Sequence, residues 1–272
     1  MDWENKYVMR DLLGEQTAHV YRDELYHATE RDRGKRILGP HQVIDISNFD
    51  VQFDSSKASK LRSMVLGLRG CHFKSLPTRM NQLINLRCLH TIFDRPNRES
   101  YEEFVVSERN RMVELRNLNQ LGGQLCIANL EKASQTADAA EAELCRKIHL
   151  RRLVLKLENP ISSDSDDCMS ILEGLEPPKE IKELKIQGNR GFIFPKWAGM
   201  GQDFKYLHHI HVSHCEKLEC LPPLGLLPAL EIILLVSLPS IKQIDNAFYG
   251  DKKTVFKSLK ELTFHSMLAW EK

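Results

Sequence analysis

The sequence predicts an α/β solenoid, a fold in which short parallel strands stack and the chain returns between them along the outer side. Three observations predict it. Eight short stretches share a template with large aliphatic residues at the first, fourth and sixth positions, which the copies at Leu61 and Leu121 fit loosely. The stretches recur at intervals of 23 to 35 residues, and prolines lie in the segments between them. The stretches begin at Leu61, Leu86, Leu121, Leu150, Ile181, Leu207, Leu230 and Leu259.

The two clearest stretches also have a turn-forming residue at the ninth position. Ile181 begins a copy that ends at Asn189, and Leu207 begins one that ends at Cys215. Both fill the leucine-rich-repeat frame L-x-x-L-x-L-x-x-N/C. In such a unit, alternate side chains of the strand point inward and are buried only against the neighbouring units. We therefore expect a leucine-rich-repeat horseshoe of about eight irregular repeats.

The segments around these strands differ in composition. Apolar residues within 4–26 have the spacing of one or two short helices, and the basic stretch 27–42 is typical of an exposed connector. This places a domain boundary near residue 40, with the repeats over 41–272. A helix is expected over 138–144, followed by cations, including Lys147, where the helix dipole favours them. The acidic run SSDSDD at 162–167 is expected to be a solvated loop.

Composition excludes several classes of protein. Lys and Arg number 38 against 37 Asp and Glu, so the formal charge of +1 provides no overall field that would attract nucleic acid or an anionic membrane. No apolar run reaches the roughly 18 residues of a membrane span. The seven cysteines lack the spacing of a zinc site or the density of a disulfide scaffold. We expect a protein of the cytoplasm or the nucleus with reduced cysteines.

Catalytic and metal sites are not expected. No G-x-S-x-G, H-E-x-x-H or paired-carboxylate arrangement stands out, so the chain is predicted not to be an enzyme. His209 and His211 lie two residues apart and should share one face of a strand. Two imidazoles can begin a metal site, but no third ligand converges on them. Solvent-facing or partner-facing histidines are the favoured interpretation.

The outward side chains of the strands are the candidates for binding a partner. Ile232, Leu234 and Val236 would form an apolar stripe on the concave surface, unless neighbouring segments cover it. Arg151 lies beside further cations that would form a small basic area on the same surface. The partner-binding candidates are Arg152, Lys156, Glu183, Lys185, His209, His211, Ile232, Leu234, Val236, Glu261 and His265.

Several strings carry a resemblance to a known family. KSLPTRMNQLINLRCLH at 74–90, the string LNQLGGQLCIANLEKASQTADAAEAELCRKIHLRRLVLKL at 118–157 and later proline-bearing segments resemble plant intracellular disease resistance proteins. These are receptors of the coiled-coil type with a nucleotide-binding (NB-ARC) module and leucine-rich repeats. YVMRDLL at 7–13 is similar to the methionine-histidine-aspartate motif of that module. Met9 and Asp11 match, but Arg10 stands where the family has histidine.

The resemblance implies a role in plant defence. It makes 1–40 a remnant of the winged-helix end of the NB-ARC module, with its connector, and 41–272 the recognition and autoregulatory repeat region. Pathogen effectors, host proteins or the nucleotide-binding module of a related receptor are the implied partners. The sequence has no phosphate-binding G-x-x-x-x-G-K-S/T loop, so no ADP or ATP site is expected. The alternatives are a truncated, non-signalling scaffold or decoy and, less favoured, an adaptor of a ubiquitin ligase.

Overall fold

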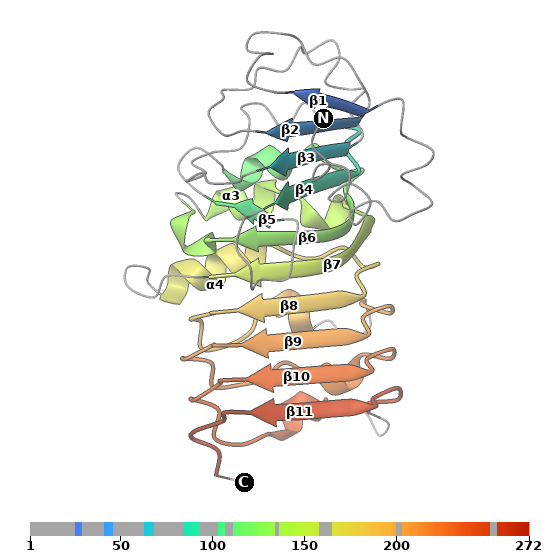
Figure 1. The fold of residues 1–272 in the computed structure, drawn as a ribbon. Coiled ribbons are helices and arrows are strands. Elements are labelled where there is room, and N and C mark those ends of the chain that lie inside the picture. Colours follow the sequence, from blue (N-terminus) through green and yellow to red (C-terminus); the bar gives the residue numbers. More distant parts are fainter. Residues whose placement is uncertain are drawn as a thin grey trace.

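Two parallel sheets that follow one another along the chain make up the strand framework (Figure 1). The structure is a computed structural model that describes residues 25–28, 41–45, 63–67, 84–92, 103–106, 111–133, 136–157, 165–199, 203–250 and 255–271. The first sheet contains β1 (Leu25–Ala28), β2 (His41–Asp45), β3 (Ser63–Gly67) and β4 (Cys88–Ile92). The second contains β5 (Glu103–Val105), β6 (Gly122–Ala128), β7 (His149–Lys156), β8 (Glu183–Gln187), β9 (His209–Ser213), β10 (Ile232–Val236) and β11 (Glu261–His265). Within each sheet, every strand pairs in parallel with its neighbour in the sequence, as a solenoid requires.

The predicted strands all coincide with strands of the structure. Each of the eight aliphatic stretches falls on one of them, and β1, β2 and β5 are strands that the template does not identify. β1 contradicts the prediction of a helix end and connector over 25–28, because pairing with β2 satisfies the backbone of these residues instead. The rest of the predicted helical remnant, including Met9, Arg10 and Asp11, lies outside the described residues.

The core consists of the side chains that point inward at alternate positions of the strands. Residues at the first, fourth and sixth template positions are at most 6% exposed from the Leu150 copy to the Leu230 copy. The ninth position closes the turn. Asn189 Oδ1 accepts a hydrogen bond from Gly191 N (2.9 Å), and the Cys215 thiol donates to Ser213 O (3.4 Å). Burial raises the pKa of the Cys215 thiol to about 12, which suits a structural cysteine.

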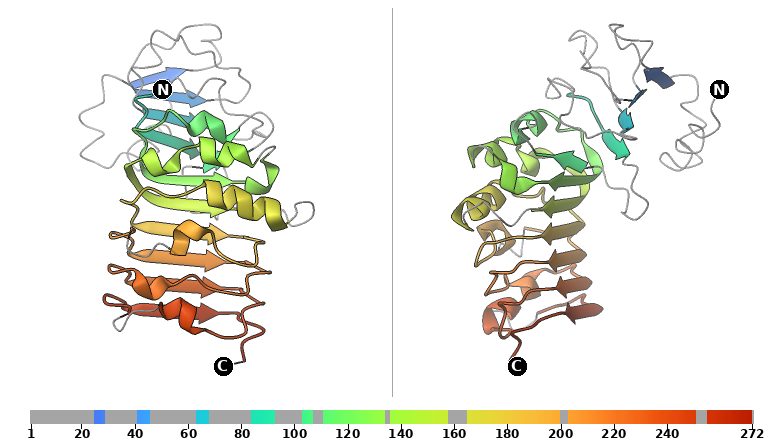
Figure 2. Two further views of the ribbon diagram at one scale, coloured as in Figure 1. Left: turned by 180° about the vertical axis from the view of Figure 1, so that it is seen from behind. Right: turned by 60° about the vertical axis from the view of Figure 1, so that its left-hand side comes forward.

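The helices cover only one face of the second sheet (Figure 2). They are η3 (Met112–Leu115), η4 (Leu130–Lys132), α3 (Ala137–Glu141), η5 (Leu144–Arg146), α4 (Ser165–Gly174), η6 (Lys196–Gly199), η7 (Leu224–Leu226) and α5 (Asn246–Tyr249). α4 corrects the loop prediction for 165–167, since these residues form the first turn of the helix. We call the opposite side the open face; it corresponds to the concave surface of the predicted horseshoe. No helix in the described parts of the chain is long and apolar enough to cross a bilayer.

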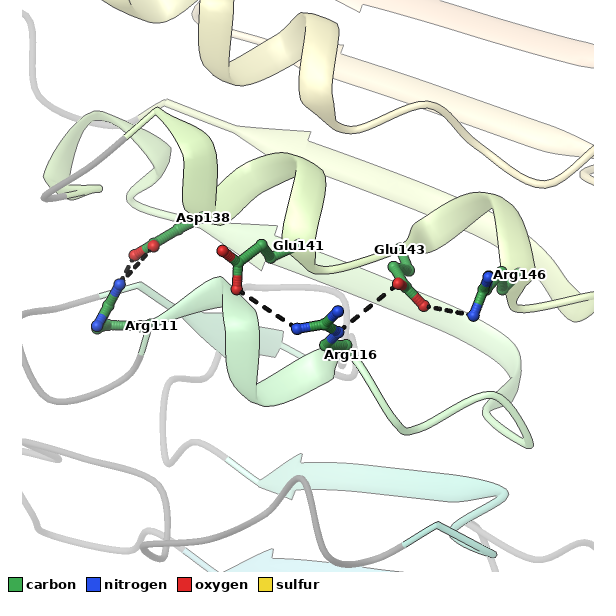
Figure 3. Close-up of polar contacts among 6 residues, drawn as sticks. All are labelled: Arg111, Arg116, Asp138, Glu141, Glu143 and Arg146. Atoms are coloured by element: carbon green, nitrogen blue, oxygen red, sulfur yellow. Dashed lines mark hydrogen bonds and ion pairs between the residues drawn. The ribbon is translucent and has the colours of Figure 1, made fainter.

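A row of ion pairs joins η3 to α3 and η5 (Figure 3). Arg111 donates from Nε (2.8 Å) and Nη2 to the two carboxylate oxygens of Asp138, whose side chain is 3% exposed. Arg116 lies 3.9 Å from Glu141 and 3.6 Å from Glu143, which also meets Arg146 at 3.1 Å. Only the first pair is bidentate and includes a buried carboxylate, that of Asp138, so we expect it to contribute most of the stabilisation in this row.

Asp138→Ala should lower the free energy of unfolding by about 2 kcal/mol, because two part-buried, charge-assisted hydrogen bonds from the Arg111 guanidinium are lost. Arg116→Ala is the matched control. It removes the longer contacts of a half-exposed guanidinium and should lower the free energy by less than about 1 kcal/mol. Urea titration monitored by circular dichroism measures both. Equal losses would show that burial of the Asp138 carboxylate does not matter.

Candidate recognition surface

The strand register arranges the outward side chains of the open face in three rows. The row at the strand starts contains Gln124, Arg152, Glu183, His209, Ile232 and Glu261. The middle row contains Cys126, Val154, Lys185, His211, Leu234 and Thr263. The third contains Lys156, Gln187, Ser213, Val236 and His265. All eleven predicted partner-binding candidates lie in these rows, so the sequence located the face; their role in binding stays a prediction.

Accessibility changes along this face. Cys126 and Val154 are fully buried although they occupy outward positions, and Lys156 is only 8% exposed. The outward residues of β8, β9 and β10 are half-buried apart from Ser213, which is buried, and Glu261 and His265 of β11 are exposed. The part of the open face from β8 to β11 can therefore contact a partner, whereas Lys156 has little surface to offer.

The predicted basic area is divided by contacts within the chain. Arg152 Nε lies 3.2 Å from a carboxylate oxygen of Glu183 on the next strand. Arg151 lies at the strand start and donates to the backbone carbonyls of Ile148 (2.9 Å) and Glu180 (3.4 Å). With Lys156 buried as well, these cations do not form one continuous exposed patch.

The two histidines of β9 lie in different surroundings. Burial, and next the positive charge of Lys185, lowers the pKa of His211 to about 4, so this imidazole is neutral at pH 7. His209 Nε2 is buried and has no hydrogen-bond partner among the described residues. The described residues also contain no group of three or more His, Cys, Asp or Glu side chains that could hold a metal ion.

A second set of polar residues, which the sequence interpretation missed, lines the edge where the strands begin. Each follows the first aliphatic residue of a copy, and the backbone amides of Lys182, Glu231 and Lys260 donate to carbonyls of the preceding copy at 2.8 Å. Lys260 Nζ lies 2.9 Å from Glu231, a contact that lowers the pKa of that carboxyl, and His208 lies 3.9 Å from the same group. The shared template position was the signal that could have identified this edge.

Comparison with known proteins shows that part of the chain is similar to the leucine-rich repeats of plant disease resistance proteins. The family model for R13L1/DRL21 leucine-rich repeats matches residues 112–238. A candidate disease resistance protein of Arabidopsis thaliana, RPP13-like protein 1, is 30% identical over 180 residues, which are 61% of this chain and 17% of that protein. Disease resistance protein RGA2 of Solanum bulbocastanum is 34% identical over 151 residues, or 54% of this chain and 14% of that protein. The chain thus spans about a sixth of the length of these relatives, whose names mention disease resistance and no enzymatic activity.

Proposed function

Since residues 112–238 match a leucine-rich-repeat family model and the similar proteins are named as plant disease resistance proteins, we propose that the chain is the repeat region of such a protein and recognises another protein through its open face. The partner is a pathogen effector, a host protein or the nucleotide-binding module of a related receptor. Contact with such a partner would couple recognition to the defence response or restrain it. The region acts by binding rather than by catalysis.

One observation supports this proposal above all. Ile232, Leu234 and Val236 form a stripe of half-buried aliphatic side chains on the accessible part of the open face, which we call the apolar stripe. Protein interfaces gain most of their free energy from a few apolar side chains that lose water on binding. The stripe provides such side chains at the centre of a surface that is otherwise polar.

The chain is also proposed to act in the cytoplasm or the nucleus without binding ADP or ATP itself. A scaffold or decoy that binds partners without signalling would use the same open face, so nucleotide binding does not separate the two functions. An effect on signalling does distinguish a regulatory region from a non-signalling scaffold. If the chain is regulatory, its expression together with a related receptor should change the defence response of that receptor.

Replacement of Ile232, Leu234 and Val236 together by serine should abolish binding to a partner that a two-hybrid screen of plant proteins identifies. Each change removes apolar area that the complex would bury, and we expect at least a tenfold loss of affinity, which corresponds to about 1.4 kcal/mol. Isothermal titration calorimetry with the purified partner provides the measurement.

The matched control replaces Glu216, Glu219 and Lys242, which are exposed and lie in the return segments outside the open face, by serine. This variant should bind as the original chain does. Similar circular dichroism spectra and melting temperatures would show that both variants are folded. Undiminished binding by the folded stripe variant would refute the proposed function.

A further inference from the structure

The apolar stripe lies between two polar columns of different chemistry. On one side the register places His209, His211 and Ser213 of β9 beside Ile232, Leu234 and Val236. On the other side it places Glu261, Thr263 and His265 of β11 beside the same three residues. The stripe therefore runs along one strand rather than across the sheet.

This direction favours an extended occupant. Alternate residues of a strand are about 6.6 to 6.8 Å apart, since the rise is about 3.3 Å per residue. An extended segment that lies along β10 presents its own alternate side chains with the same spacing and can place one on each of Ile232, Leu234 and Val236. A helix has a pitch of about 5.4 Å, so its contacts would lose register over three positions.

The β9 side of the stripe is compatible with an apolar interface. His211 is neutral at pH 7 because burial and the positive charge of Lys185 lower its pKa to about 4. A partner that covers Leu234 would thus desolvate a neutral imidazole, which costs less than desolvating a cation. The half-buried His211 can still form a hydrogen bond with the backbone of the partner.

The β11 side carries one available negative charge. Glu261 is exposed, lies beside Ile232 at the strand start, and accepts a hydrogen bond from the Thr263 hydroxyl (3.3 Å). The nearby carboxylates are already neutralised, Glu183 by Arg152 and Glu231 by Lys260. Across the part of the chain that the structure describes, no cation pairs with Glu261.

On the basis of the proposed function, we infer that the open face binds an extended segment of a partner protein with alternating apolar side chains and a basic residue at the end that meets Glu261. The aliphatic residues supply affinity through burial, and the basic residue fixes the orientation of the segment along β10. The inferred partner segment thus has a defined conformation, side-chain pattern and charge, which burial of apolar side chains alone would not specify.

Synthetic peptides test this inference without a known partner. The probes are Arg-Thr-Leu-Thr-Leu-Thr-Leu and its reversed order, which cover both directions along β10, and the same peptides with Glu in place of Arg. Fluorescence anisotropy at low salt measures their binding to the complete chain. One Arg peptide should bind about fivefold or more tightly than its Glu counterpart, as expected for one partly exposed charge pair.

Variants of the chain then identify the residues responsible. E261Q should remove the preference for Arg, and E261K should reverse it in favour of Glu. E216K makes the same change of charge on an exposed residue outside the open face and should leave the preference intact. Leu234→Asp should abolish the binding of every peptide while the melting temperature shows that the chain is folded.

Three results would overturn the inference. They are failure of all peptides to bind the original chain, an Arg preference that persists in E261K, and self-association through the stripe, seen as a dimer that Leu234→Asp dissociates in sedimentation. If the peptides fail but the partner from the two-hybrid screen still depends on the apolar stripe, the partner chemistry is wrong and the proposed function stands.

Discussion

Gly188→Ala is expected to destabilise the protein by about 3 kcal/mol or more, through backbone strain and overpacking together. Gly188 follows β8 and has a φ of +77°, a left-handed backbone conformation that residues other than glycine rarely adopt. A Cβ at this position would lie 2.2 Å from the backbone oxygen of Leu157 in the preceding copy. The Gly188 amide also donates to Ser213 O (2.9 Å), so the residue cannot move away without loss of a hydrogen bond to the next copy.

Gly123→Ala distinguishes backbone strain from overpacking. Gly123 has a similar φ of +73° at a register irregularity between β6 and β7, but a Cβ at this position would have no atom within 4 Å outside its chain neighbours. This variant should lose about 1 kcal/mol from strain alone. Urea unfolding with comparable m-values measures both variants. If the two losses are equal, the close approach of neighbouring copies at Gly188 does not contribute.

Lys147 is expected to make the stability depend on pH between about 8 and 10.5. Its side chain is fully buried, and Nζ donates to Leu115 O (2.6 Å) at the end of η3. Burial lowers the pKa of Lys147 from 10.5 to about 8. Between these values the unfolded chain binds a proton that the folded chain does not, so the free energy of unfolding rises with pH.

Lys147→Met removes this group and retains an unbranched side chain of similar size. The free energy of unfolding of the original chain, relative to that of the variant, should increase by about 2 to 3 kcal/mol from pH 7 to pH 10. Urea titrations at several pH values measure the difference, in which the other titrating groups cancel. A difference that is constant across this range would mean that the lysine is protonated in the folded state throughout.

Much of the strand framework could be predicted from the sequence because burial in a solenoid follows a local period. Leu153, Ile210 and Ile233 were identified as inward from spacing alone, and all three are buried. β5 was missed because its short run around Phe104 lacks the six-residue template, although Phe104 is fully buried. Lys147 was expected just after a helix, where the helix dipole favours cations. Its burial depends on packing of η5 against η3, which no local pattern contains.

For the candidate surface, the sequence could predict which side chains lie on the open face but not how they pair or how deeply they are buried. Alternation places Glu183, His209 and Ile232 on one face, but their row depends on register, and the Arg152–Glu183 pair follows from register alone. Burial of Lys156 could not be predicted from the alternation of its strand, which assigns it to the open face. The low pKa of His211 results first from its burial and next from the charge of Lys185 on the adjacent strand, and the local pattern contains neither.

Site-specific photo-crosslinking tests most directly whether the open face is the recognition surface. A benzophenone amino acid replaces either Leu234 on the open face or the exposed Lys242 in a return segment, and each folded variant is irradiated with the partner from the two-hybrid screen. Efficient crosslinking from position 234 and none above background from position 242 is the predicted result. Crosslinking from position 242 but not from position 234 would show that recognition occurs elsewhere on the molecule.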